Sequence, residues 1–141
     1  MFVGFHDRQL DDKGRCALPA SYRREIDEDH CYVSLGDDGC VTLRKAADFE
    51  AHARETIEQQ KQGEISQLRR REMATNSAIA TIDKQGRITI DERFRVHAGI
   101  APGAPVIVAG NYDAIEIWKP ERFLTVEAEG RDEAPAREWV D

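Results

Sequence analysis

The sequence predicts a mainly β protein with short helices (α+β), in which two copies of a β-β-α-β-β module are joined by a helical linker. Three observations predict this fold: an internal repeat, alternating apolar runs on either side of Gly-containing turns, and a helical pattern between the two copies. At 141 residues the chain has room for one ordinary domain or for two repeats that share a core. A large multidomain enzyme is therefore excluded.

The internal repeat is the strongest of these observations. Residues 11–15 (DDKGR) recur 72 positions later as residues 83–87 (DKQGR). Further along the chain the offset becomes 74, because residues 41–43 (VTL) match residues 115–117 (IEI). Two extra residues must enter the second copy, and we expect them in the loop at residues 101–103.

Each copy begins with a predicted β-hairpin. In the second copy, residues 77–82 and 87–90 are β-type runs that flank a turn at residues 83–86, where glycine tolerates a positive φ. Ile88 and Ile90 alternate with polar residues, so the arginine at position 87 should point away from the core. The first copy has the same pattern.

A short helix and a second hairpin should follow. Asp91 is a candidate N-cap, Phe94 and Ala98 form an i, i+4 apolar stripe, and Gly99 is expected to end the helix. The next two apolar runs, residues 106–109 and 114–118, are separated by turn residues and predict a hairpin. The first copy repeats this pattern with Tyr22 and Ile26 in the helix and with residues 32–35 and 40–43 in the hairpin.

We divide the chain into residues 1–48 (first repeat), 49–74 (helical linker), 75–123 (second repeat) and 124–141 (acidic tail). The linker has Phe49, Ala53 and Ile57 at helical spacing, and Gly63 is expected to interrupt it. Residues 127–141 mix acidic residues with Ala, Pro and Gly, which predicts a partly disordered tail. Trp139 is its only large apolar residue and is a candidate to dock on the rest of the protein.

The composition argues for a cytoplasmic protein. The apolar runs are too short to cross a bilayer, and the odd number of cysteines (Cys16, Cys31 and Cys40) argues against a disulfide framework. The formal net charge of −7 would disfavour nucleic acid if it were spread evenly. We expect much of the acidic charge, in the tail and at residues 27–29, to lie away from the repeated turns.

The motifs of catalysis and metal binding are missing from the sequence. The four histidines lack metal-ligand spacing, and no phosphate-binding Gly-rich loop, nucleophile elbow or pair of catalytic carboxylates is recognisable. We therefore expect a protein that is not an enzyme, with no cofactor, no metal, no membrane and no small-molecule substrate. A small hydrolase with an acidic site is the least favoured alternative.

The chain resembles the MraZ family, part of the wider AbrB/SpoVT superfamily. The resemblance is carried by Phe2-x-Gly4, by residues 10–19 (LDDKGRCALP), by the second Asp-x-x-x-Arg element at 83–87 and by residues 115–118 (IEIW). It implies two swapped-hairpin modules that form one pseudo-twofold barrel, and chains that assemble into a homo-oligomeric ring. It also implies a sequence-specific regulator of transcription that binds short direct repeats in the promoter of its own division and cell-wall operon. Such a protein would be associated with the nucleoid.

The repeated turns supply residues suited to double-stranded DNA. Arginine can donate two parallel hydrogen bonds to a phosphate or to guanine in the major groove, so Arg15 and Arg87 are the expected DNA contacts, with Lys13 and Lys84 on phosphates. Asp11 with Gly14, and Asp83 with Gly86, are expected to orient the two loops. The resemblance points to the same Asp and Arg positions.

Two alternatives remain open at this point. Each Asp–Arg pair could be only a structural ion pair, since surface pairs are common and weak. The whole protein could also be an antitoxin-like or scaffolding barrel whose main partner is another protein. The run Arg69-Arg70-Arg71, which alternates with glutamates in the linker, is interpreted as a solvated helix face.

Overall fold

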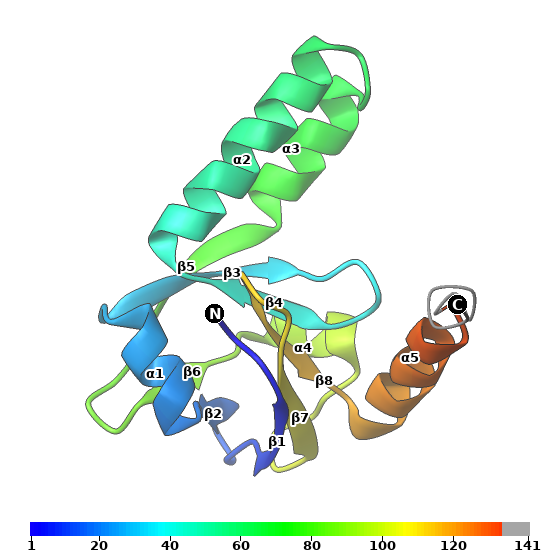
Figure 1. Ribbon diagram of the computed structural model, residues 1–141. Coiled ribbons are helices and arrows are strands. Elements are labelled where there is room, and N and C mark those ends of the chain that lie inside the picture. The colour runs from blue at the N-terminus through cyan, green and yellow to red at the C-terminus, as the bar shows by residue number, and fades with distance from the viewer. Residues whose placement is uncertain (134–141) are drawn as a thin grey trace, which may run out of the picture.

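The computed structural model describes residues 1–133, and the predicted α+β fold with two β-β-α-β-β modules is confirmed (Figure 1). Within these residues the strands are β1 (Phe5–Gln9), β2 (Arg15–Ala17), β3 (His30–Leu35), β4 (Val41–Arg44), β5 (Ser77–Thr81), β6 (Arg87–Thr89), β7 (Pro105–Gly110) and β8 (Ile115–Trp118). The helices are α1 (Ala20–Ile26), α2 (Ala46–Lys61), α3 (Gln67–Thr75), α4 (Glu92–Ala98) and α5 (Pro120–Asp132).

The two copies exchange strands. Six strands form one antiparallel sheet in the order β1-β7-β8-β4-β3-β5, and β2 pairs with β6 in a separate two-stranded sheet. In the large sheet, β1 of the first copy pairs with β7 of the second, and β5 of the second copy pairs with β3 of the first. Both sheets therefore contain strands from both copies, and the copies form one folded unit.

This exchange corrects the expected hairpins at the start of each copy. The chain does turn after β5, and an isolated bridge between Ile82 and Ile88 joins the two arms, but β5 and β6 pair with β3 and β2 instead of with each other. Alternation of apolar residues predicts which face of a strand is buried, but it does not predict which strand lies beside it. A strand from another part of the chain can pair there and leave the same face buried. The later hairpins, β3–β4 and β7–β8, form as predicted.

Equivalent residues of the two copies face each other at the centre of both sheets. Cys16 lies opposite Ile88 in the β2–β6 ladder, and Thr42 lies opposite Glu116 in the β4–β8 ladder. These pairs are separated by 72 and 74 residues, which are the offsets of the internal repeat. A pseudo-twofold axis therefore passes through both pairs, as the resemblance implies.

The core lies between the two sheets and is closed by α1 and α4. Each of these helices buries the predicted stripe, Tyr22 with Ile26 and Phe94 with Ala98. Asp91 stands at the N-cap position of α4, but its side chain makes no capping hydrogen bond, so the predicted cap is present only in its backbone conformation. Gly99 ends α4 with a φ of 68°. The segment between α4 and β7 has three residues more than the one between α1 and β3, and the β7–β8 turn is one residue shorter than the β3–β4 turn, so the second copy gains two residues in total.

The linker forms a helical hairpin that projects from the body of the molecule, as Figure 1 shows. The helices α2 and α3 are separated near Gly63, which has a φ of 78°, as the sequence predicts. None of the helices in residues 1–133 combines the length and the apolar character that a membrane span requires.

The expectation of disorder after residue 127 is wrong for residues 127–132, which belong to α5. Pro120 stands in the first turn of this helix, where its fixed φ suits the start of a helix. Phe123 and Val126 pack against a small cluster that includes Trp118, so the helix has an apolar anchor. Trp139, the candidate docking residue of the tail, lies outside the described residues.

Candidate nucleic-acid interface

The first Asp-x-x-x-Arg element is a tight turn organised by Asp11. Its Oδ1 accepts hydrogen bonds from the backbone N–H groups of Lys13 (2.9 Å) and Arg15 (2.8 Å), and its Oδ2 accepts one from Arg15 Nε at 2.5 Å. The backbone N–H of Gly14 donates to the Asp11 carbonyl at 3.1 Å, and Gly14 has a φ of 76°. One carboxylate therefore fixes both the turn and the inner end of the guanidinium group.

The second element has the same geometry. Asp83 Oδ1 accepts from the backbone N–H groups of Gln85 and Arg87, each at 2.9 Å, and Asp83 Oδ2 accepts from Arg87 Nε at 2.9 Å. Gly86 has a φ of 77° and donates its N–H to the Asp83 carbonyl at 2.9 Å. The two loops are thus structural equivalents in their backbone and in their Asp–Arg pair.

Hydrogen bonding lowers the pKa of both aspartates. The pKa of Asp11 lies below its ordinary value chiefly because of the hydrogen bond from the backbone of Arg15, and the pKa of Asp83 is lowered chiefly by the hydrogen bond from the backbone of Arg87. A carboxylate that accepts several N–H groups is stabilised in its charged form. Both loops therefore hold their aspartates as anions at neutral pH.

Arg15 and Arg87 share one face of the small β2–β6 sheet. Cys16 and Ile88 are fully buried, so the residues before and after them in each strand point to the opposite, outer face. Arg15 lies opposite Thr89, and Arg87 lies opposite Ala17, so the two arginines are diagonal neighbours. The backbones of such neighbours in an antiparallel pair are about 7–8 Å apart.

The terminal ends of both guanidinium groups stay available for a ligand. Among the hydrogen bonds of residues 1–133, Arg15 and Arg87 use Nε for their aspartates, and neither Nη1 nor Nη2 has a protein partner. Each side chain keeps about 28% of its surface exposed. An arginine held at its inner end and open at its outer end is suited to bidentate hydrogen bonds with a phosphate or a guanine edge.

The two lysines are exposed but do not occupy equivalent positions. Lys13 is the third residue of its turn, whereas Lys84 is the second residue of the other turn, where the first loop has Asp12. The two loops therefore present their lysines at different points around the same backbone. The difference is already visible in the sequence, which reads DDKGR in the first turn and DKQGR in the second.

Each loop also receives an arginine from the other copy. The helix of the second copy brings Arg95 against the first loop, where its Nε would lie 3.1 Å from a Cβ added at Gly14 and donates to the Ile90 carbonyl at 2.9 Å. The helix of the first copy brings Arg23 against Gly86 in the second loop, so closely that a Cβ there would overlap its guanidinium group.

The sequence does not identify Arg23 and Arg95 as loop contacts, because each lies far along the chain from the loop that it contacts. One signal was present: the two residues match at the offset of 72 in the internal repeat. The exchange of strands turns that match into two equivalent contacts between copies.

The acidic residues 27–29 do not lie away from the loops, contrary to the sequence-based expectation. They share a surface depression with Arg23, Asp83 and Lys84, and the Ile82 N–H donates to the Asp29 carbonyl at 2.7 Å. Strand exchange again explains the difference, because it carries the end of α1 to the loop of the second copy. The equivalent segment beside the first loop, residues 99–104, carries no charged side chain, and Gly103 donates its N–H to the Asp11 carbonyl at 3.1 Å.

Fold and site together define a class of protein: a β protein with two internal copies, exchanged strands and a pair of Asp–Arg loops on one pseudo-twofold face. The sequence matches the family described as "MraZ protein, putative antitoxin-like" over residues 1–70 and 73–139. The chain belongs to the MraZ family.

Individual relatives cover nearly the whole chain. The protein from Saccharopolyspora erythraea named transcriptional regulator MraZ is 36% identical over 99% of this chain and 96% of its own length. Proteins of the same name from Corynebacterium jeikeium and Mycoplasmopsis synoviae are 33% and 34% identical, over 94% and 87% of this chain and 91% and 84% of their own lengths. The name that these relatives carry is that of a regulator of transcription and not of an enzyme.

Proposed function

We propose that this chain is a sequence-specific DNA-binding regulator of transcription that acts through the outer face of the β2–β6 sheet. The observation that carries the proposal is the pair of arginines, Arg15 and Arg87, each fixed by an aspartate at Nε and open at its outer end. The relatives named transcriptional regulator MraZ support the same conclusion.

In this proposal the side chains have distinct roles. Arg15 and Arg87 donate to base edges or phosphates, Lys13 and Lys84 contact phosphates, and the two loop aspartates keep the turns in shape. Arg23 and Arg95 add a positive charge to the loop of the other copy. At the second loop these positive charges stand against the acidic residues 27–29, which share its surface depression.

We further propose that several chains act together, as a ring, on short direct repeats upstream of the protein's own division and cell-wall operon. One chain offers only a few cationic contacts, and each neutralised phosphate contributes about −0.9 to the slope of log affinity against log salt. Linking several pairs of loops would raise the affinity by avidity, on the order of 10²–10⁴-fold. Binding to such repeats would place the protein on the nucleoid.

Fluorescence anisotropy of a labelled duplex tests this function. The duplex carries the region upstream of the protein's own operon, an unrelated duplex of equal length is the control, and both are titrated with the wild-type protein at two salt concentrations. We expect tighter binding to the operon duplex and a steep loss of affinity with salt. No binding at low salt would contradict the proposal and would favour the antitoxin-like or scaffolding alternative, in which the partner is a protein.

A further inference from the structure

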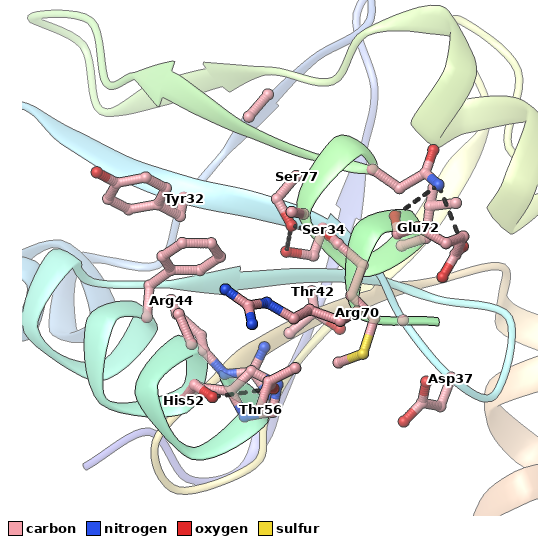
Figure 2. Close-up of a pocket in the computed structure, with 18 of the residues that line it drawn as sticks. Tyr32, Ser34, Asp37, Thr42, Arg44, His52, Thr56, Arg70, Glu72 and Ser77 are labelled. Carbon is pink, nitrogen blue, oxygen red and sulfur yellow. Dashed lines mark hydrogen bonds between the residues drawn. The ribbon is translucent and has the colours of Figure 1, made fainter. Parts of the chain in front are cut away.

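A second candidate site lies far from the β2–β6 face, between the projecting helical hairpin and the large sheet. Here α2, α3 and the strands β3, β4 and β5 enclose a cavity of about 840 Å³ (Figure 2). Pockets that bind small molecules are commonly 300–1,000 Å³ and combine apolar walls with a few polar groups. The cavity is therefore large enough for a small organic ligand.

The charged residues that line this cavity leave a surplus of positive charge. Its acidic residues, Asp37 and Glu72, both pair with Arg69, the former at 3.6 Å. Arg70 donates from Nη1 to the amide oxygen of Gln60 at 2.9 Å, and within residues 1–133 neither Arg70 nor Arg44 forms an ion pair with a carboxylate. Two guanidinium groups thus face the cavity without a counter-ion.

One of these guanidinium groups has a buried donor without an acceptor. Arg44 Nε is shielded from solvent and has no hydrogen-bond partner in the part of the chain that the structure describes. A buried polar group without a partner is costly, more so when it is charged, and such groups in folded proteins are usually satisfied by protein, water or a ligand. Arg44 is therefore an incompletely satisfied cation at the wall of the cavity.

The remaining walls supply hydroxyl, imidazole and apolar groups. Thr42 from β4 and His52 from α2 line the cavity beside Arg44, as Figure 2 shows. Burial, followed by the nearby charge of Arg44, lowers the pKa of His52, so this ring is neutral at physiological pH. Ile57 and Met73 form an apolar part of the wall.

We propose that this cavity binds a small organic phosphate, with the phosphate held between Arg44 and Arg70 and the organic part against the apolar wall. Arginine donates in a planar fork that matches phosphate oxygens, and Arg44 and Arg70 can each offer such a fork to one phosphate group. The ligand would bridge the sheet and α3, and so would fix the helical hairpin on the body. This proposal does not depend on DNA binding, because the β2–β6 sheet lies at the other end of the molecule (Figure 1).

Isothermal titration calorimetry of the full chain with phenyl phosphate tests the proposal. Inorganic phosphate, benzoate and phenol are titrated in parallel, so that the contributions of the phosphate, the charge and the ring are separated. We expect one molecule of phenyl phosphate per chain, with weaker binding of inorganic phosphate and benzoate and none of phenol. Benzoate binding as tight as that of phenyl phosphate would overturn the proposal. So would an absence of phenyl phosphate binding, which is the result expected if a neighbouring copy fills the cavity.

Matched variants locate the site. Arg44→Gln and Arg70→Gln should each weaken phenyl phosphate binding roughly 10- to 100-fold, which is the effect of losing a charge-assisted hydrogen bond. Arg71→Gln is the control, since Arg71 is on the same helix but does not line the cavity. Thermal unfolding shows whether each variant is folded, and Arg70→Gln carries the test alone if Arg44→Gln is not. Unchanged affinity in a folded Arg70→Gln protein would overturn the assignment.

Discussion

Cys16 lies directly opposite Ile88 at the centre of the β2–β6 ladder, and the two residues are equivalents in the internal repeat. Because the pseudo-twofold axis passes between them, Arg15 and Arg87 take equivalent places on either side of it. A sheet with one strand from each copy therefore presents two Asp–Arg loops in one fixed relationship. The pairing of β2 with β6 is what brings the two loops together within a single chain.

The centre of this ladder should be critical for stability. Ile88→Ala removes a fully buried side chain and should lower the free energy of unfolding by about 2–5 kcal/mol. Ile79→Ala is the matched control, because Ile79 is 64% exposed in β5 and its truncation should cost much less. Chemical denaturation measures both. A similar loss in the two variants would contradict the packing described for β6.

The loop glycines should not tolerate a side chain. Gly14→Ala and Gly86→Ala force alanine into positive φ and press a Cβ against Arg95 and Arg23 respectively, so we expect a loss of stability of about 1–3 kcal/mol and weaker DNA binding. Gly63→Ala separates the two effects, since Gly63 has a φ of 78° but open space around its Cβ position and lies in the linker. Thermal unfolding and anisotropy are the measurements. If Gly63→Ala lowered the stability as much, the positive φ alone would account for the loss and the contacts with the arginines would not matter.

The arginines that cross between copies should support DNA binding. Arg23→Ala and Arg95→Ala each remove one positive charge beside a loop, and we expect a weaker, less salt-dependent interaction, with the salt slope reduced by about 1 per engaged phosphate. The control is Arg93→Ala in α4, because Arg93 stacks on Phe94 and donates to the Thr75 carbonyl instead of contacting a loop. An unchanged salt slope in both loop variants would assign Arg23 and Arg95 a purely structural role.

The fold could be predicted from the sequence to a large extent because its signals are local. The apolar stripes of α1 and α4 and the turns of the later hairpins depend on neighbouring residues, and the repeat is a direct match between two stretches of the sequence. Strand partners could not be predicted in this way, since the pairings of β5 with β3 and of β6 with β2 join distant segments. The helical extension to Asp132 was also missed, because its anchor on Trp118 is a tertiary contact.

The same limit applies to the candidate site. The Asp–Arg pairs are separated by four residues and were visible as a motif, whereas Arg23 and Arg95 reach loops of the other copy. The proximity of residues 27–29 to Lys84 was likewise hidden by strand exchange. The cavity between the helical hairpin and the large sheet brings together Arg44 and Arg70, which belong to elements that are not adjacent in sequence. The run at residues 69–71 also gave no sign that Arg69 pairs with carboxylates whereas Arg70, within the described residues, does not.

The loops should be sensitive to acid. The pKa of Asp11 and of Asp83 is lower in the folded protein than the ordinary value of 3.8, so each carboxylate stabilises the fold above that value, and this stabilisation is lost as the pH falls through the lower folded pKa. NMR titration of the side-chain carboxyl carbons should give midpoints below 3.8 for both residues. Asp11→Asn should remove the contribution of the first loop while leaving the titration of Asp83 unchanged. A midpoint at or above 3.8 would show that the hydrogen bonds of the turn are not formed in solution.

The central claim is that Arg15 and Arg87 bind DNA, and the most direct measurement compares the double variant Arg15→Ala/Arg87→Ala with the wild type by anisotropy on the operon duplex. Each lost contact should cost about 1–3 kcal/mol of binding free energy, with the far-ultraviolet circular dichroism unchanged. Arg54→Ala, on the exposed side of α2, is the control and should bind like the wild type. A folded double variant that binds the duplex as tightly as the wild type, with the same salt slope, would contradict the account.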